Sequence, residues 1–431
     1  MKREYTELLT RVGEGTPMGT FFRQYWLPVL PSKELTEPGG RPLRVRLLGE
    51  DLLVYRSPSG EVGLVGEHCA HRRASLYFAR NEKEGLRCVY HGWKFDSAGK
   101  CIDAPNVNSS ERVTSVVRTR AYPCVERNGV IWTFMGDPAK KPELPALEWN
   151  LVPEAQSFYS IKYQGSNWLQ TLEGDIDSSH AGFLHGTNAA ADAADDKWFG
   201  MPGSGWLYQA LDKRPTHDIA HTDYGMVLGA CRNTPDGKNY WRIYQILMPS
   251  QVMIPAYGDD PFPAQLFVPA DDYSTVIWSI NWHPTKEFGK DSLTPIHDFA
   301  YEPPSPEAWG RWRAKANRAN SYFFDEHKKD RFFGVPDLPW QDQAMHESMG
   351  AIVDRTQEHL CESDFGIVQA RRMWIKEVNA LVKENRPSRG VNSPESYAVR
   401  STSVVAGKDE NWLEVAKERL QAIPGHLVPA A

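Results

Sequence analysis

The sequence predicts an α+β protein in which a small all-β domain precedes a larger domain with an antiparallel sheet flanked by helices. Short alternating apolar runs punctuated by Gly and Pro dominate residues 26–135, and strand-like and helical patterns are mixed from there to the C-terminus. A Pro- and Lys-containing linker lies between the two regions. We therefore expect an N-terminal helical segment at 1–24 that packs on the larger domain, the β domain at 25–137 and the larger domain at 138–431.

The elements follow from the spacing of apolar residues along the chain. Helical spacing predicts a helix over 3–24 that is broken at 13–17, where two glycines and a proline lie. Alternation predicts strands at 43–47, 52–55, 62–65 and 130–134 in the β domain, and strand-like runs predict two more at 240–247 and 274–280 in the larger domain. Helical patterns in the larger domain span 167–183, 305–319 and 340–358.

Composition excludes several classes of function. The net charge is −6 and no basic tract is present, so nucleic acid is not an expected partner. No run of eighteen apolar residues occurs, and the N-terminus lacks the apolar region of a signal peptide, so we expect no membrane contact and a cytoplasmic protein. Six cysteines in 431 residues are too few for a disulfide scaffold.

Two short Cys-His pairs are the strongest chemical signal in the sequence. Cys69 and His71 form C-x-H, and after sixteen residues Cys88 and His91 form C-x2-H. Two thiolates and two imidazoles suit either a tetrahedral zinc or a [2Fe–2S] cluster with two His on one iron. Because each loop supplies one Cys and one His, the spacing favours the cluster, which passes single electrons at about −150 to +300 mV.

The residues around His91 make the pattern specific. Gly92 would let the backbone approach cluster sulfurs, and Trp93 and Phe95 would exclude water. The runs C-x-H-R-x-A and C-x-Y-H-G-W-x-F resemble the Rieske domain of ring-hydroxylating non-haem iron oxygenases. This resemblance implies that Cys69, His71, Cys88 and His91 hold a Rieske [2Fe–2S] cluster.

A second candidate metal site follows in the larger domain. His180 and His185 are five residues apart, about 140° around a regular helix, so one metal could bind both only if the helix is distorted, for example near Gly182. Two imidazoles and one carboxylate form the ligand set of non-haem Fe(II) oxygenases. By itself H-x4-H is unremarkable, but D-x2-H-x4-H after the first motif resembles the iron-binding pattern of the same family and implies a mononuclear Fe(II).

The third iron ligand must come from another segment. A helical wheel over 340–358 places Asp342 within about 80° of Met345, Met349, Ile352, Val353 and Leu360, on an apolar inward face. A buried carboxylate needs a cation or donors, which iron would provide. Resemblance to the phthalate-dioxygenase-like branch also points to the Asp of D-Q-A-x-x-E. The alternative is an ordinary acid in the first turn of a helix.

Asp177 lies three residues before His180, on the same helical face. In this family the matching acid accepts hydrogen bonds from an iron-ligand His and from a cluster His of the neighbouring subunit. The resemblance therefore implies an electron bridge from His91 of a neighbouring subunit through Asp177 to His180, in a head-to-tail homotrimer or a dimer of trimers. A more limited role is the orientation of one imidazole.

The substrate class follows from resemblance and one arginine. Segments near 7–19 and 347–356 resemble phthalate 4,5-dioxygenase-type enzymes, which act on aromatic carboxylates. Arg242, in the strand at 240–247, could bind a carboxylate bidentately or could be a solvent-facing arginine. Since 203–208 offers no second cation, we expect cis-dihydroxylation of a substituted (for example chloro-) benzoate. O-demethylation or monooxygenation of a methoxylated aromatic acid and phthalate 4,5-dioxygenation remain alternatives.

No G-x-G-x-x-G follows a predicted strand, so the chain is not expected to bind a nicotinamide or flavin. The resemblance implies a separate flavin/[2Fe–2S] reductase that supplies electrons from NAD(P)H, with O2 as the oxidant. Two rivals of another class are a Rieske electron carrier, which needs only about the first 140 residues, and a zinc-binding interaction module.

Overall fold

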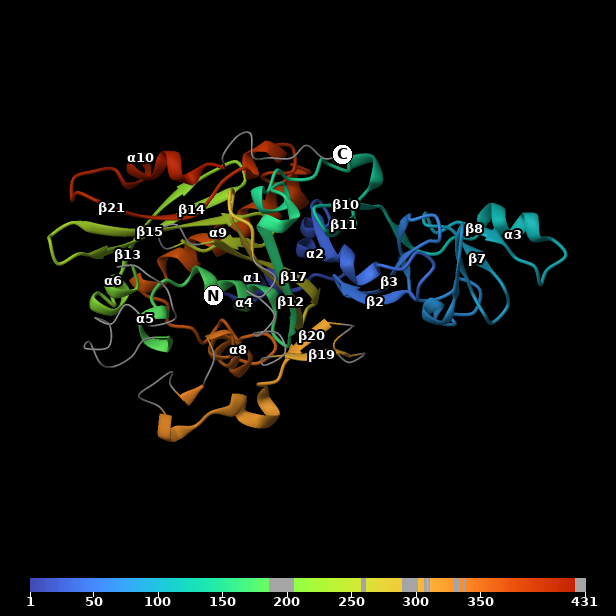
Figure 1. The fold of residues 1–431 in the computed structure, drawn as a ribbon, viewed down its shortest axis with the longest axis horizontal. Helices are drawn as coiled ribbons and strands as arrows, with labels where there is room; N and C mark the ends of the chain where they lie inside the picture. The colour runs from blue at the N-terminus through green and yellow to red at the C-terminus, as the bar shows by residue number, and fades with distance from the viewer. Residues whose placement is uncertain are drawn as a thin grey trace.

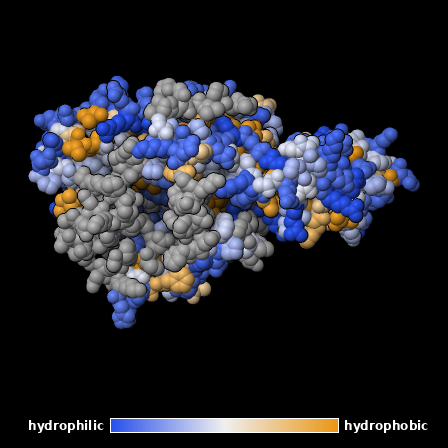
Figure 2. Space-filling model, in the orientation of Figure 1, coloured by the Kyte–Doolittle hydropathy of each residue, from blue (hydrophilic) through white to orange (hydrophobic). Residues whose placement is uncertain are grey.

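The computed structural model describes residues 1–185, 205–256, 261–288, 301–305, 308, 311–328, 334–335 and 338–422. The molecule is elongated, with a small β lobe at one end and a larger lobe built on a long sheet (Figure 1), and the same outline is seen in the space-filling view (Figure 2). In the described part of the chain, no helix is both long and apolar enough to cross a membrane.

Two short helices begin the chain, α1 (Arg3–Thr10) and α2 (Pro17–Phe22). The predicted break between them is therefore confirmed. The Thr16 hydroxyl accepts a hydrogen bond from the Gly19 amide and caps α2. The amide of Val12 donates to Asp272 of the larger lobe at 2.8 Å, so this segment lies against that lobe.

The small lobe contains three sheets. In the first, β1 (Trp26–Pro31), β11 (Val130–Phe134) and β10 (Cys124–Arg127) pair in that order. The second contains β2 (Leu43–Leu47), β3 (Glu50–Arg56), β4 (Val62–Gly66) and β9 (Ala121–Tyr122), and the third contains β5 (Arg80–Glu82), β6 (Gly85–Arg87), β7 (Lys94–Phe95) and β8 (Cys101–Asp103). The helix α3 (Ser110–Val116) lies at the outer end of this lobe (Figure 1). The four strands predicted here are confirmed.

One ten-stranded sheet organises the described part of the larger lobe. Its strands run in the order β13 (Thr216–His221), β14 (Gly225–Asn233), β15 (Asn239–Leu247), β16 (Gln251–Met253), β17 (Phe262–Asp271), β18 (Ser274–Trp282), β12 (Ser157–Gln164), β20 (Arg311–Ala314) and β19 (Tyr301–Ser305), while β21 (Thr402–Ala406) pairs with β15. Most neighbours are antiparallel, and the strands predicted at 240–247 and 274–280 are confirmed within β15 and β18.

Helices complete the larger lobe: α4 (Trp168–Ile176), α5 (Ala181–Leu184), α6 (Gly205–Leu211), α8 (Leu338–Ser348), α9 (Phe365–Glu384) and α10 (Trp412–Ala416). Trp168 of α4 packs edge-to-face on Trp374 of α9 at 5.4 Å between ring centroids. Both indoles belong to a single apolar core that continues into the N-terminal helices and the small lobe. The buried faces of α4 and α9 therefore hold the helices on the sheet.

Three predicted helices differ from the structure. The helix expected at 167–183 is interrupted after Ile176, and α8 ends at Ser348 because Gly350 adopts a left-handed backbone with φ +91°. The helix expected at 305–319 is wrong where the chain is described, since residues 311–314 form β20, which pairs with both β12 and β19. Pairing at the sheet edge outweighs the local helical pattern there.

A hairpin turn fastens the two lobes together. The amides of Leu48 and Gly49, between β2 and β3, donate to the carbonyls of Pro269 and Ala270 at the end of β17, at 2.9 and 2.7 Å. These two bonds extend the small lobe's backbone pairing onto the large sheet. The expected domain boundaries at 24 and 137 remain a prediction, because the apolar core crosses both.

Candidate metal centres

The first site lies at the tips of two loops of the small lobe. Cys69 and His71 follow β4, and Cys88 and His91 lie between β6 and β7. Both cysteines are buried, and the rings of His71 and His91 meet edge-to-face with centroids 4.6 Å apart. The structure therefore brings all four predicted ligands together.

Each loop is closed by a backbone turn around its cysteine. The carbonyl of Cys69 accepts from the Arg73 amide, and that of Cys88 accepts from the Gly92 amide, both at 2.9 Å. Gly92 has φ +77°, and a Cβ there would lie 2.8 Å from Pro105. Glycine is needed at this position for the turn and for the approach of Pro105.

Trp93 covers one histidine of this site. Its indole stacks on His71 with ring centroids 4.4 Å apart and planes 9° apart, and its Nε1 donates to Asn106 at 2.7 Å. Phe95 is also buried, in a small apolar core that includes both cysteines. The expected exclusion of water by Trp93 and Phe95 therefore has a structural basis.

The side chains fit a metal cluster. The Nδ1 atom of His71 is buried and has no hydrogen-bond partner among the described residues, a costly arrangement that a metal bond would relieve. Burial raises the pKa of the Cys69 thiol to about 11, with the neighbouring Cys88 as a further cause. Paired buried thiolates therefore need a cation, which iron supplies.

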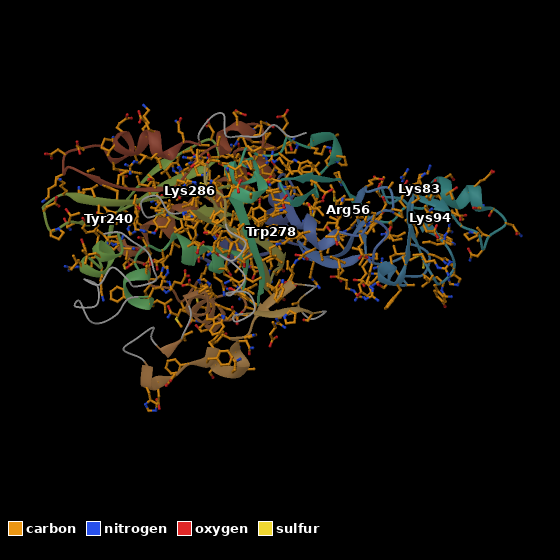
Figure 3. All side chains as sticks on the ribbon, viewed as in Figure 1. Arg56, Lys83, Lys94, Tyr240, Trp278 and Lys286 are labelled. Carbon is orange, nitrogen blue, oxygen red and sulfur yellow. The ribbon has the colours of Figure 1, made fainter. Side chains whose placement is uncertain are left out.

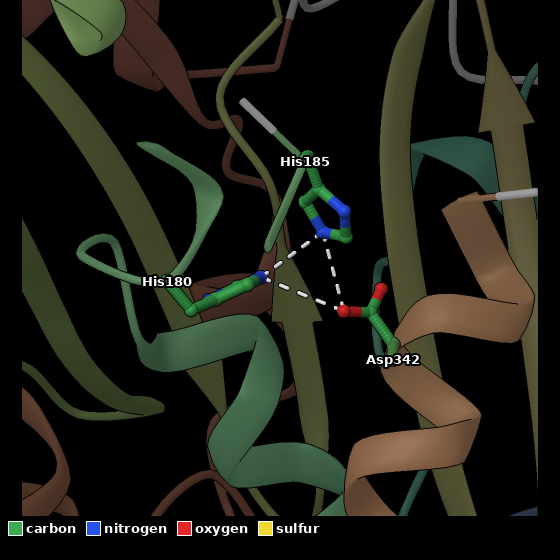
Figure 4. Close-up of side chains that lie close together, drawn as sticks. All are labelled: His180, His185 and Asp342. Carbon is green, nitrogen blue, oxygen red and sulfur yellow. Dashed lines mark hydrogen bonds and ion pairs between the residues drawn. The ribbon is translucent and has the colours of Figure 1, made fainter. Parts of the chain in front are cut away.

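The second site joins three side chains from two segments of the larger lobe (Figure 4). The Nε2 atoms of His180 and His185 are 3.2 Å apart, and they lie 3.6 and 3.2 Å from Oδ1 of Asp342. One ligand atom from each residue lies within 4.8 Å of the others. This arrangement can hold one metal and leave other coordination positions open.

The segment that carries both histidines is set apart from α4 by a break in the helix. The single turn α5 lies between the two histidines, with His180 before it and His185 after it. The break falls before His180, at 177–180, and residues 181–184 are helical, so the distortion expected near Gly182 is wrong. Gly182 instead gives α6 room, since a Cβ there would lie 3.0 Å from the Gln209 carbonyl.

Both histidines are oriented through their other nitrogen. The Nδ1 atom of His180 lies 2.5 Å from the Asp177 carbonyl, and Nδ1 of His185 lies 2.7 Å from Oε1 of Gln341. Gln341 is fully buried and donates to the Val335 carbonyl at 2.8 Å. These bonds fix the tautomers that direct both Nε2 lone pairs toward Asp342. The sequence contained no signal for Gln341, which contacts a histidine 156 residues away.

Asp342 lies beside the two histidines, but not because it belongs to an apolar face of its helix. Met345 and Met349 are 41 and 50% exposed, so the apolar face drawn by the helical wheel does not exist. The inward face of α8 carries Trp340 and Ala344 instead. Asp342 lies in the second turn, so it is not a first-turn acid. Burial opposes ionisation, but the hydrogen bond and charge of His185 lower the pKa of Asp342 to about 2.

Asp177 ends α4 and shapes the loop to His180. Its Oδ1 accepts from the Ser179 amide at 2.7 Å and from the His180 amide at 3.3 Å. Its Oδ2 lies 3.9 Å from Nδ1 of His180, and the side chain is 26% exposed. The carboxylate thus lies beside an iron-ligand candidate and is open to a second molecule.

Arg242 is buried on β15, with 4% exposure, so the solvent-facing alternative is wrong. Its Nε donates to the Tyr244 hydroxyl at 3.3 Å, and that hydroxyl lies 3.3 Å from Oγ of Ser178, in the loop before His180. Tyr240, labelled in Figure 3, precedes Arg242 by two residues and packs against Tyr208 of α6. This face of β15 therefore points toward the metal site. The segment 203–208, in which the sequence offers no second cation, lies partly outside the described residues.

Comparison with known proteins identifies the family. Residues 25–123 match the Rieske [2Fe-2S] domain, and residues 133–425 match the family described as LigXa C-terminal domain like. The second match alone spans more than half of the chain. This chain belongs to the Rieske non-haem iron oxygenases. It is the oxygenase component of a multicomponent system, in the phthalate 4,5-dioxygenase-like branch.

Relatives span nearly the whole Rieske oxygenase chain. The 3-chlorobenzoate-3,4-dioxygenase oxygenase subunit of Comamonas testosteroni is 36% identical over 97% of this chain and 98% of its own. The phthalate 4,5-dioxygenase oxygenase subunit of Pseudomonas putida is 32% identical over 94% of this chain and 92% of its own. Dicamba monooxygenase bound to dicamba shares the fold, with a TM-score of 0.54 at 19% identity over 85% of this chain and all of its own.

Proposed function

We propose that this oxygenase subunit hydroxylates an aromatic monocarboxylate, by cis-dihydroxylation of a substituted benzoate such as a chlorobenzoate. The observation that carries the proposal is the buried guanidinium of Arg242, linked through Tyr244 to the loop that bears His180. The relative from Comamonas testosteroni, a 3-chlorobenzoate-3,4-dioxygenase subunit, supports the same substrate class.

We assign the metal ligands as follows. Cys69, His71, Cys88 and His91 would hold the [2Fe–2S] cluster, and His180, His185 and Asp342 would hold the mononuclear Fe(II). When bound, the cluster supplies single electrons and the ferrous iron supplies a site for O2. The chain's own side chains orient the ligands, cover His71 with Trp93 and keep both Nε2 atoms directed at one point.

Arg242 would set the orientation of the ring. A guanidinium binds a carboxylate through two parallel hydrogen bonds, and it remains charged when buried. Tyr240 and Tyr244 on the same face of β15 would contact the apolar part of the substrate. A benzoate held in this way presents a fixed edge of its ring to the metal site, and this orientation determines which carbons react.

O-demethylation of a methoxylated aromatic acid is the second candidate. It is favoured by another relative, the 5,5'-dehydrodivanillate O-demethylase oxygenase subunit of Sphingobium sp., which is 31% identical over 91% of this chain and 84% of its own. The same ligands and the same arginine would serve this reaction. A pure electron carrier is disfavoured because a carrier does not need the three clustered ligands of the larger lobe.

We propose that electrons come from a flavin/[2Fe–2S] reductase that uses NAD(P)H in the cytoplasm, and that the subunit works as a head-to-tail homotrimer or dimer of trimers. Val89 and Tyr90, next to His91, are 58 and 56% exposed, which would suit contact with a neighbouring subunit. The exposed edge of Asp177 would then receive His91 of that neighbour and complete the path to His180.

The test is turnover of a panel of benzoates, methoxybenzoates and phthalate with a reconstituted reductase and ¹⁸O2. Mass analysis should find both oxygen atoms in a cis-diol of a benzoate. Arg242→Ala should raise the KM for benzoates by about 10- to 100-fold, since a charged hydrogen-bonded contact contributes about 1.5–3 kcal/mol, and Arg242→Lys should restore part of it. If Arg242→Ala leaves the KM unchanged, the carboxylate assignment is wrong.

A further inference from the structure

A cavity of about 400 Å³ lies beside the first cluster loop, on the small lobe. Its walls come from the start of β3, the end of β4, the loop after β4 and the segment 118–120. Ala70, the residue between Cys69 and His71, is part of the wall. A partner bound in this cavity therefore contacts a residue whose two neighbours in the sequence are cluster ligands.

The carboxylates in the wall are already neutralised. Glu50 accepts from Arg23 and Arg120, at 2.7 and 2.6 Å. The other two wall carboxylates, Glu67 and Asp51, pair with Arg44 at 2.9 Å and with Arg46 at 3.1 Å, respectively. Three of these four arginines lie outside the wall, and Arg120 is the wall arginine that takes part in these pairs, so the wall carboxylates do not neutralise the other two wall arginines.

Two arginines of the wall have no such partner. Arg73 and Arg118 are exposed and form no ion pair with any residue that the structure describes. Arg73 is held at the cavity by the turn around Cys69, where it adopts a left-handed backbone with φ +62°. The cavity thus presents two unneutralised guanidinium groups on a chain whose net charge is −6.

We propose that this cavity is the docking site for a carboxylate-bearing surface of the electron-donor protein. The inference rests on the proposed function only in requiring that electrons come from a separate protein. An acidic donor is repelled by a chain of net charge −6, and a local cationic site beside the cluster overcomes that repulsion and orients the encounter. Guanidinium groups favour carboxylates because both groups are planar and form two parallel bonds.

The experiment follows reduction of the Rieske absorbance by stopped flow, with an acidic plant-type [2Fe–2S] ferredoxin as donor and no aromatic substrate. The variant R73E/R118E should lower the second-order rate at least tenfold at low salt and should flatten its dependence on ionic strength. Arg112→Glu, on α3 of the same lobe but outside the cavity wall, should retain the wild-type salt dependence with a smaller loss. Dithionite should reduce the cluster of every variant completely.

Several results would overturn the inference. Equal rates for R73E/R118E and Arg112→Glu, or a wild-type rate that does not depend on salt, would exclude steering by this cavity. Inhibition by inorganic phosphate beyond that by chloride at equal ionic strength would make it a small-anion site. A change in oligomeric state on R73E/R118E would make it a contact between copies of this chain. Since no aromatic substrate is used, a wrong substrate assignment does not affect the outcome.

Discussion

Replacing Gly174 with alanine should weaken the mononuclear iron site and leave the Rieske cluster intact. Gly174 lies on α4, which leads to Asp177 and His180, and it faces His346 on α8, which carries Asp342. A Cβ at Gly174 would lie 2.3 Å from Nε2 and 2.8 Å from Cε1 of His346. The close approach of these two helices therefore sets the distance between iron ligands of different segments.

The size of the effect follows from the overlap. Carbon and nitrogen atoms pack at about 3.5 Å, so the two helices must separate by roughly 1 Å. The His346 ring has little room to turn, because it is buried and its Nδ1 lies 3.3 Å from Nε2 of Gln164. Metal–ligand distances tolerate a deviation of only about 0.2 Å. We expect a loss of about 1–3 kcal/mol in stability from overpacking and about 10- to 100-fold in Fe(II) affinity.

The assay is Fe(II) binding to the chelated protein, with the Rieske absorbance as an internal standard. Gly174→Ala should bind Fe(II) more weakly, whereas Gly165→Ala is a matched control because its Cβ would meet only Glu347 at 3.8 Å. Adding His346→Ala to Gly174→Ala should recover binding, a coupling that general destabilisation would not produce. Wild-type affinity in Gly174→Ala, or no recovery in the double variant, would refute the reasoning.

Three further predictions concern residues around the iron site. Asp177→Asn should keep both metals, by iron analysis and EPR, and lose nearly all turnover; substantial activity would remove Asp177 from the electron path. Gln341→Ala removes the partner of His185, so Fe(II) affinity should fall about 10- to 100-fold, and an unchanged affinity would show that the bond does not orient the ring. Burial lowers the pKa of His346 to about 4, so folding favours its neutral form. The contribution of His346 to the free energy of unfolding should therefore be fully present above about pH 6.5 and should fall by at most about 3 kcal/mol toward pH 4. The His346→Gln variant, measured by urea unfolding, should lack this part of the pH dependence.

The cluster site was predictable because its chemistry is local. All four ligands lie within two short loops, and the residue types and spacing that define them are read directly from the sequence. The strand β2 was also predictable, because alternation of apolar and polar residues reflects the two faces of a strand, whereas β15 is buried on both faces and was recognised from its run of aromatic and β-branched residues. The helix expected at 305–319 failed because pairing of β20 with β12 and β19 is a non-local contact that outweighs helical spacing.

Prediction of the iron site depended on both the sequence pattern and the tertiary packing. Its residue types and the order D-x2-H-x4-H are properties of the sequence, but the break that sets the two histidines apart from α4 arises where Asp177 ends α4 and its side chain accepts the following amides. The orientation of His185 depends on Gln341, which only the packing of α8 brings near.

The ligand types, the cluster motif, six of the strands and the family could all be read from the order of the residues. Folding was needed to see how α8 turns Asp342 toward the two histidines, that Arg242 is buried, and that two arginines beside the cluster loop lack acidic partners among the described residues. The spacing of apolar residues shows that one face of a helix or strand is buried, but it does not show which other element covers that face. That second fact depends on sheet register and helix packing between residues far apart in the chain.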